Sequence, residues 1–229
     1  MQNCSFETEI KVIIVGNGGI GKTTLMNRFL DSLFSADYIK TIGVDFLEKR
    51  VFVPSVHEEV TFFLYDTAGQ EEYDALTRSY YRGAGACIIA YSITDRLSFG
   101  SVPCWLRKVR EECGMIPVVL VETKVDLADE TTVSAEESTA QAVELGLSLF
   151  RVSSKQNLNV NEVFHRLCFD YVRRRRLVGG QLENPCRTLD ELISPKASSA
   201  AEFSIGRSNF TRRSYLLNCV ISSSCLFVV

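Results

Sequence analysis

The sequence lacks the features that mark secreted, membrane-spanning and zinc-binding proteins. Residues 1–9 are polar and have neither the basic nor the apolar region of a secretory signal. No run of 18 or more apolar residues occurs, so we expect no transmembrane helix. The eight cysteines form no C-x-x-C pair, and only two histidines accompany them. We therefore predict reduced thiols in a cytoplasmic protein, with no zinc site.

The chain also lacks a basic excess, because its formal net charge is −3. A protein that holds a nucleic-acid backbone concentrates lysine and arginine, so we expect no nucleic-acid partner. Its 229 residues, of which 46% are hydrophobic, are enough for one domain with a sizeable core and a tail.

Apolar runs and helical patterns alternate along the first three quarters of the chain. Strands are predicted over 10–15, 44–53, 60–65, 86–91, 117–121 and 149–152, and helices over 22–33, 98–113, 134–145 and 161–176. Short runs that are apolar throughout indicate strands buried on both faces. We therefore predict an α/β fold with a six-stranded, mainly parallel sheet and helices on both faces.

The composition changes after the last predicted helix. Glycine, proline, serine and alanine interrupt every periodic pattern there. We predict one domain over 1–176 and a flexible tail over 177–229.

Residues 16–23 read G-N-G-G-I-G-K-T and fit the pattern G-x-x-x-x-G-K-[ST]. The stretch follows a predicted strand and opens a predicted helix, which is the context that this phosphate-binding loop requires. Glycines let backbone N–H groups surround phosphate oxygens, the helix N-terminus favours the anion, and a lysine and a threonine serve phosphate and Mg²⁺. The predicted phosphate-binding residues are Gly18, Gly19, Ile20, Gly21, Lys22, Thr23 and Thr24.

A second group of residues fits the terminal phosphate. Asp66 ends the third predicted strand, where its carboxylate can hold Mg²⁺ through water. Gly69 can offer a backbone N–H to the phosphate, and Gln70 can orient an attacking water. Thr41 lies before the second strand, where its hydroxyl reaches Mg²⁺ only while the γ-phosphate is present. The predicted metal-binding residues are Thr23, Thr41 and Asp66.

The ends of the last two strands fit a guanine base. Asp126, in T-K-V-D, can accept both N1–H and the exocyclic amine of guanine, a pairing that adenine cannot make. Lys124 would lie across the ring, and the backbone N–H of Ser154 would bond the guanine O6. The predicted base-binding residues are Thr123, Lys124, Asp126, Ser153, Ser154 and Lys155.

With these motifs in this order, the chain resembles a Ras-superfamily small GTPase, and specifically a Rab, over about residues 9–176. The Rab-like stretches are I-G-V-D-F at 42–46, G-Q-E-E-Y at 69–73 and Y-Y-R-G-A at 80–84. The resemblance implies a small-GTPase nucleotide-binding domain, with Phe34 edge-on to the guanine and Tyr38 closing over the phosphates. The stretches 41–48, 70–74 and 157–164 are similar to the Rab subgroup numbered twenty-three, which is associated with membrane traffic, cilia and hedgehog signalling.

The resemblance implies a molecular switch that hydrolyses GTP to GDP, with Lys22 and Gln70 as its catalytic residues and Mg²⁺ as its cofactor. The implied partners are an exchange factor, a GTPase-activating protein that inserts an arginine, and effectors that read the GTP form; the switch itself is expected to be a monomer. Two alternatives stay open. One is a GTP-loaded binding module that never hydrolyses, and the other is a P-loop kinase acting on a small molecule.

The sequence departs from the family at three places. Thr123 replaces the asparagine of N-K-x-D, and because its hydroxyl does not span as far as an amide, we expect weaker nucleotide affinity. Tyr65 replaces a tryptophan. The C-terminus has no C-a-a-X cysteine, so Cys225 or Cys219 is the candidate for lipidation, and contact with an endomembrane or the plasma membrane would be peripheral.

Overall fold

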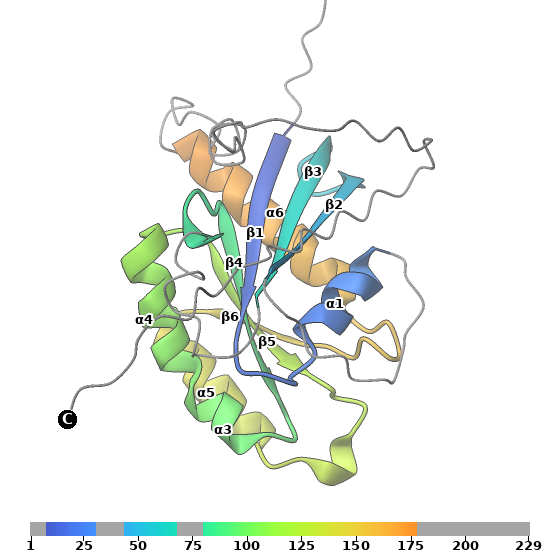
Figure 1. Ribbon diagram of the computed structural model, residues 1–229, viewed down its shortest axis with the longest axis vertical. Coiled ribbons are helices and arrows are strands. Elements are labelled where there is room, and N and C mark those ends of the chain that lie inside the picture. Colours follow the sequence, from blue (N-terminus) through green and yellow to red (C-terminus); the bar gives the residue numbers. More distant parts are fainter. Residues whose placement is uncertain (1–7, 31–43, 68–79, 178–229) are drawn as a thin grey trace, which may run out of the picture.

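The computed structural model describes residues 8–30, 44–67 and 80–177, and these form a sheet that lies between two groups of helices (Figure 1). Six strands are hydrogen-bonded in the order β2-β3-β1-β4-β5-β6. The strands are β1 (Thr8–Val15), β2 (Val44–Val53), β3 (Glu58–Thr67), β4 (Ala86–Ser92), β5 (Val118–Thr123) and β6 (Ser148–Arg151). The helices are α1 (Lys22–Phe29), α3 (Arg96–Gly100), α4 (Val102–Cys113), η2 (Ala128–Glu130, a 3-10 helix), α5 (Ala135–Leu145) and α6 (Val160–Leu177).

The predicted fold class is confirmed. The β2–β3 hairpin is antiparallel, and the four other strand pairs are parallel. Side chains of β1 alternate between two cores: Ile10, Val12 and Ile14 pack with α1 and α6, whereas Ile13 and Val15 pack with α3, α4 and α5. The strand is therefore buried on both faces, as its apolar sequence indicates.

The predicted helix over 98–113 is wrong in one respect, because the structure divides it at Ser101 into α3 and α4. Pro103 lies in the first turn of α4. Proline has no N–H and its ring clashes with the preceding turn, so it is accepted there but not within a helix. The predicted capping box of α5 is confirmed, since Ser134 Oγ accepts from Glu137 N and the Glu137 carboxylate accepts from Ser134 N.

The parallel strands bring the sequence motifs to one edge of the sheet. β1, β3, β4, β5 and β6 all run in the same direction, so their carboxyl ends meet at that edge. Residues 16–23, 123–126 and 153–155 lie where β1, β5 and β6 end, in the loops that follow these strands and in the adjoining residues of α1 and β5. Ligands of open α/β sheets bind at this edge.

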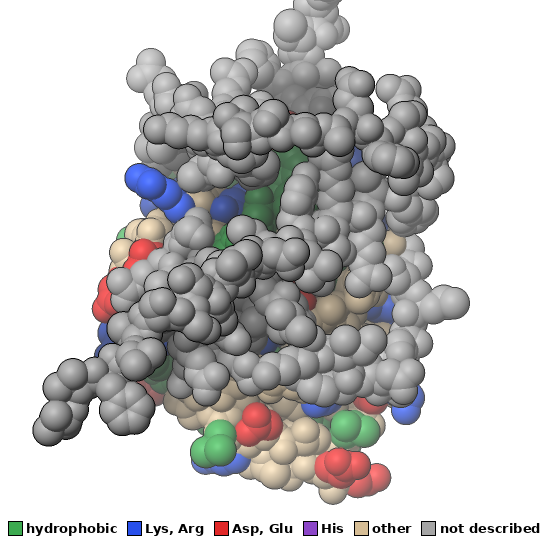
Figure 2. Space-filling model, in the orientation of Figure 1, with side chains coloured by type: hydrophobic (Ala, Val, Ile, Leu, Met, Phe, Trp, Pro, Cys, Tyr) green, Lys and Arg blue, Asp and Glu red, His purple; other side chains and the backbone are tan. Residues whose placement is uncertain are grey.

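Two observations concern the helices and the visible surface of the described residues. None of the helices in the described ranges is both long and apolar enough to cross a bilayer. In the view of Figure 2, acidic, basic and hydrophobic side chains are interspersed at the lower end of the molecule. The prediction of no nucleic-acid partner rests on the net charge and stays a prediction.

Gly16, the residue that follows β1, passes very close to β4. A Cβ atom built on it would lie 2.2 Å from the Ala90 carbonyl oxygen, and its φ is +140°. Only glycine accepts both the contact and the backbone conformation without strain. The direction in which the chain leaves β1 therefore depends on this residue.

We expect Gly16→Ala to lower the free energy of unfolding by about 3 kcal/mol, because the methyl group must displace the β4 backbone. Gly100→Ala is the matched control, since a Cβ there meets nothing within 4 Å and its φ is not positive. The control should leave stability unchanged or raise it by up to about 1 kcal/mol. Urea denaturation measures both, and equal losses in the two variants would contradict the steric argument.

Candidate functional site

The loop between β1 and α1 has the backbone that an anion site needs. Gly19 and Gly21 have φ values of +73° and +96°, which glycine adopts at little cost. Gly21 is the N-cap of α1, and its position supplies no side-chain cap. Because the first N–H groups of a helix have no partner within the helix, they are suited to bind an anion such as phosphate.

Lys22 lies inside this loop with only 5% of its surface exposed. Its Nζ donates to the carbonyl oxygens of Gly16 at 2.8 Å and Asn17 at 2.7 Å. Burial lowers the pKa of Lys22 from its ordinary value of 10.5 to about 8, and the Asp66 carboxylate offsets part of that change. An anionic ligand at the loop would stabilise the ammonium form further, so the site favours negative charge.

Thr23 and Asp66 bring two oxygen donors together. The Thr23 hydroxyl donates to Asp66 Oδ2, and Asp66, which is fully buried, pairs in register with Ile14 of β1. Hydroxyl and carboxylate oxygens are the donors that Mg²⁺ prefers, so this pair fits that cation. The residues that the structure describes contain no cluster of three or more histidine, cysteine, aspartate or glutamate side chains that could hold a metal ion.

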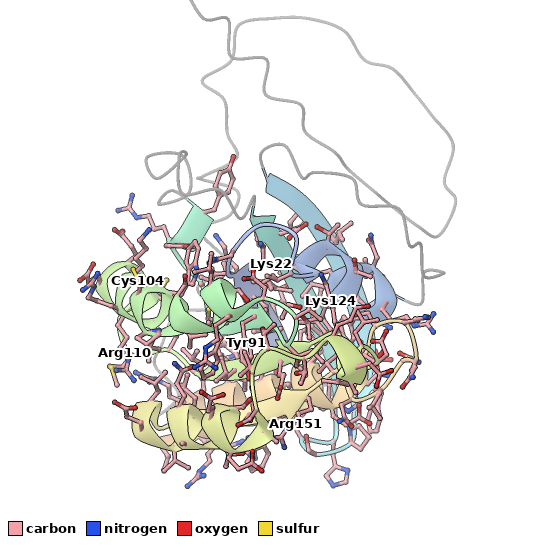
Figure 3. The ribbon with its side chains drawn as sticks, turned by 90° about the horizontal axis from the view of Figure 1, so that it is seen from below. Lys22, Tyr91, Cys104, Arg110, Lys124 and Arg151 are labelled. Atoms are coloured by element: carbon pink, nitrogen blue, oxygen red, sulfur yellow. The ribbon has the colours of Figure 1, made fainter. Side chains whose placement is uncertain are left out.

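The end of β5 holds the phosphate loop from the side. Thr123 Oγ1 lies 2.6 Å from the Ile20 carbonyl oxygen and 2.9 Å from that of Tyr91. The hydroxyl therefore reaches a carbonyl of the loop, and our expectation that Thr123 weakens nucleotide affinity stays a prediction. Lys124 Nζ donates to the Gly19 carbonyl oxygen at 2.9 Å. Figure 3 shows Lys22 and Lys124 near each other.

The two segments predicted to bind the base, 123–126 and 153–155, are hydrogen-bonded to each other. Ser153 Oγ donates to Asp126 Oδ1 at 2.6 Å, and Gln156 N donates to Ser153 Oγ. Ser154 follows as a half-buried residue, and Lys155 is exposed. The structure therefore brings Asp126 and the 153–155 segment together, as the order of the motifs predicts.

A buried carboxylate lies directly behind these segments. Glu122, whose side chain is 4% exposed, pairs with Arg151 Nε at 3.1 Å and lies 3.4 Å from Ser138 Oγ. Burial raises the pKa of Glu122, and Arg151 offsets part of the rise. Since Glu122 precedes Thr123 and Arg151 lies two residues before Ser153, this ion pair ties together the strand ends that carry both base-side segments.

Several predicted site residues lie outside the described residues. Their assignments stay predictions: Phe34, Tyr38, Thr41, Gly69, Gln70, Cys219 and Cys225. The predicted tail over 177–229 lies outside them too, except for Leu177, the last residue of α6.

Sequence reasoning missed the hydrogen bonds that Trp105 and Ser101 form with Asn17, a residue of the phosphate loop. Asn17 occupies a position at which the loop pattern accepts any residue, and its Oδ1 accepts a hydrogen bond from Trp105 Nε1 at 2.9 Å. Its Nδ2 donates to Ser101 Oγ at 3.3 Å. A polar side chain inside a glycine-rich loop and the single tryptophan of the chain were the available signals, but their pairing depends on tertiary structure.

Comparison with known proteins agrees with this geometry. Residues 11–172 match the model of the Ras family. The human Ras-related protein Rab-3D is 32% identical over 198 residues, which cover 86% of this chain and 83% of the relative. The GTP-binding protein yptV2 of Volvox carteri is 38% identical, covering 74% and 78% of the two chains. The Ras-related protein Rab-3 of Caenorhabditis elegans is 38% identical, covering 71% and 74%.

We expect Thr123→Val to speed the release of a fluorescent GDP analogue about two- to tenfold, because it removes one hydrogen bond to the phosphate loop, which is worth about 0.5–1.5 kcal/mol. Valine keeps the volume of threonine, so packing changes little. Thr131→Val, at an exposed position after η2, is the control and should leave release unchanged. Identical release rates in wild type and the Thr123 variant would show that the contact does not brace the loop.

Proposed function

We propose that this chain, which belongs to the Ras family and to its Rab branch, uses the loop at residues 16–23 to bind guanine nucleotide and change shape with it. Proteins of this family are small GTPases, and the chain is a GTPase that hydrolyses GTP to GDP and phosphate. The observation that supports the proposed site best is the buried Lys22 ammonium, because a cation held against two loop carbonyls is poised for phosphate oxygens.

We assign the nucleotide to residues at the carboxyl edge of the sheet. The phosphates would contact the loop amides and Lys22, and the guanine would pair with Asp126, with Lys124 across the ring and the Ser154 N–H on O6. The full proposed set is Gly18, Gly19, Ile20, Gly21, Lys22, Thr23, Thr24, Phe34, Tyr38, Thr41, Gly69, Thr123, Lys124, Asp126, Ser153, Ser154 and Lys155. The Ser153–Asp126 hydrogen bond supports the base site, because it fixes one carboxylate oxygen.

Hydrolysis of GTP at this site requires positioning and neutralisation of charge. Lys22 and the loop amides would stabilise negative charge on the β- and γ-phosphates, and Gln70 would orient the attacking water. Thr23, Asp66 and Thr41 would hold Mg²⁺, which supplies further neutralisation of the phosphate oxygens.

We further propose that hydrolysis is slow without a partner. None of the stretches 16–23, 66–71, 123–126 and 153–155 contains an arginine that could stabilise the transferring phosphate. A GTPase-activating protein would supply that arginine. An exchange factor would replace GDP with GTP.

The output of the switch would be binding. With GTP present, the segments around Thr41 and Gln70 would order and present an apolar surface that includes Ile42, Val44, Phe46 and Tyr80. Phe46 already stacks on Phe63, with ring centroids 5.8 Å apart, so one edge of that surface is built on the β2–β3 hairpin. Effectors in vesicle-mediated transport would read it.

The finer placement within the Rab branch is also a proposal. The stretches at 41–48, 70–74 and 157–164 support the subgroup numbered twenty-three, and through it a role connected with cilia or hedgehog signalling. We place the protein in the cytoplasm and peripherally on an endomembrane or the plasma membrane, with Cys219 or Cys225 as the site of lipidation.

The purified protein should carry one molecule of GDP or GTP per protein molecule, and anion exchange of the denatured extract measures this directly.

Asp126→Asn should lower the affinity for guanosine nucleotides at least about tenfold, because a hydrogen bond to a charged group is worth about 1.5–3 kcal/mol. The variant should gain affinity for xanthosine nucleotides, whose C2 oxygen can accept from the new amide. Asp129→Asn, an exposed position on η2, is the control. Adenine nucleotide in the wild type, or unchanged base preference in the variant, would contradict the base assignment.

Gln70→Leu should lower the partner-stimulated rate of hydrolysis about 10²-fold, since leucine cannot orient the water. Single-turnover hydrolysis with a GTPase-activating protein measures this rate. Gln141→Leu on α5 removes the same amide from another part of the chain and should leave the rate unchanged. A stimulated rate equal to that of wild type would show that Gln70 has another role.

A further inference from the structure

The phosphate loop is held on a second side by a contact that the proposed function does not use. Trp105 lies on α4, is 6% exposed, and packs in the core that also contains Val109. Its indole N–H donates to Asn17 Oδ1 at 2.9 Å. Asn17 is the second residue of the loop, so a helix that supplies no phosphate-binding residue is hydrogen-bonded to the loop itself.

Both ends of the Asn17 side-chain amide are hydrogen-bonded, one to α4 and the other to the junction of α3 and α4. While Trp105 binds its oxygen, its Nδ2 donates to Ser101 Oγ at 3.3 Å, and Ser101 Oγ in turn donates to the Leu97 carbonyl oxygen at 2.9 Å. Ser101 is the residue at which α3 gives way to α4. The orientation of Asn17 therefore depends on how α3 and α4 meet.

The backbone of Asn17 connects these side-chain hydrogen bonds to Lys22 of the proposed phosphate site. Its carbonyl oxygen accepts from Lys22 Nζ at 2.7 Å, so the same residue is bound by the indole through its side chain and by the loop lysine through its main chain. A phosphate that draws Lys22 away would alter the hydrogen bonding of Asn17, while a displaced Asn17 would alter the position of Lys22.

We propose that Trp105 is a positioning residue for nucleotide binding, which acts by fixing Asn17 and with it the path of the phosphate loop. The inference rests on the proposed guanine-nucleotide site. It makes the junction of α3 and α4 a place from which nucleotide retention is controlled. Since Trp105 is the single tryptophan of the chain, its emission also reports the state of the loop.

The test is a double-mutant cycle on the release of a fluorescent GDP analogue from the full chain. Trp105→Phe keeps an aromatic ring but removes the donor, and Asn17→Ala removes the acceptor. Each should speed release about two- to tenfold, as expected for one hydrogen bond. The double variant should be no faster than the faster single variant, because both changes break the same contact.

A packing control separates positioning from general stability. Val109 is buried on the same face of α4, four residues from Trp105, and has no polar side-chain atom. Val109→Ala should lower the thermal midpoint without changing GDP release. A rise in release with Val109→Ala equal to that with Trp105→Phe would mean that any weakening of α4 has this effect, and would overturn the proposal.

The emission of Trp105 gives a readout that does not depend on folding of the Trp105 variant. Nucleotide-loaded and nucleotide-stripped wild type should differ in emission wavelength or intensity, and Asn17→Ala should abolish the difference. Additive effects in the cycle, or a full emission response in Asn17→Ala, would overturn the positioning role while leaving the nucleotide site intact. A wild-type chain that binds no GDP at all would overturn both the proposed function and this inference.

Discussion

The arrangement of the site depends on one buried cation. An ammonium group removed from water is costly unless polar atoms surround it, and Lys22 meets that cost with two loop carbonyls and a neighbouring carboxylate. To keep those carbonyls in place, the chain must leave β1 along a path that only Gly16 permits and enter α1 through left-handed glycines. The sequence of the loop therefore allows a lysine to be buried, with its ammonium group hydrogen-bonded, beside a site that can bind an anion.

Hydrogen bonds from the end of β5 and from α4 hold the loop in place. At the end of β5, Thr123 and Lys124 contact the carbonyls of Ile20 and Gly19, whereas Trp105 of α4 contacts the side chain of Asn17. The residues predicted to bind the base and those predicted to bind phosphate are therefore parts of one hydrogen-bonded frame. A frame of this kind explains how the short Thr123 side chain can replace a longer amide: the loop carbonyl approaches the strand closely enough for a hydroxyl.

Most of the fold could be predicted from the sequence because local patterns and global layers agree. Strands such as 86–91 are apolar throughout because both faces are covered, and Ser134 with Glu137 caps α5 as the pattern indicates. The division at Ser101 was missed because the apolar period continues across Pro103. The order of the motifs predicted that Lys22, Asp66 and Asp126 lie at the carboxyl edge of the sheet, where the structure has them, and their roles stay predictions. The Asn17–Trp105 and Glu122–Arg151 contacts could not be predicted, since each joins residues that only tertiary packing or strand register brings together.

The strand order has a consequence for the behaviour of the protein at high concentration. Within the described sheet, β2 and β6 each have a neighbour on one side only. An open edge of ten residues can recruit a strand from another molecule and start aggregation. β2 carries Glu48, Lys49 and Arg50 in succession, and charged residues on an edge strand oppose such pairing. β6 is only four residues long, so it offers little backbone to a foreign strand. The two edges thus discourage self-association by different means, one by charge and one by shortness.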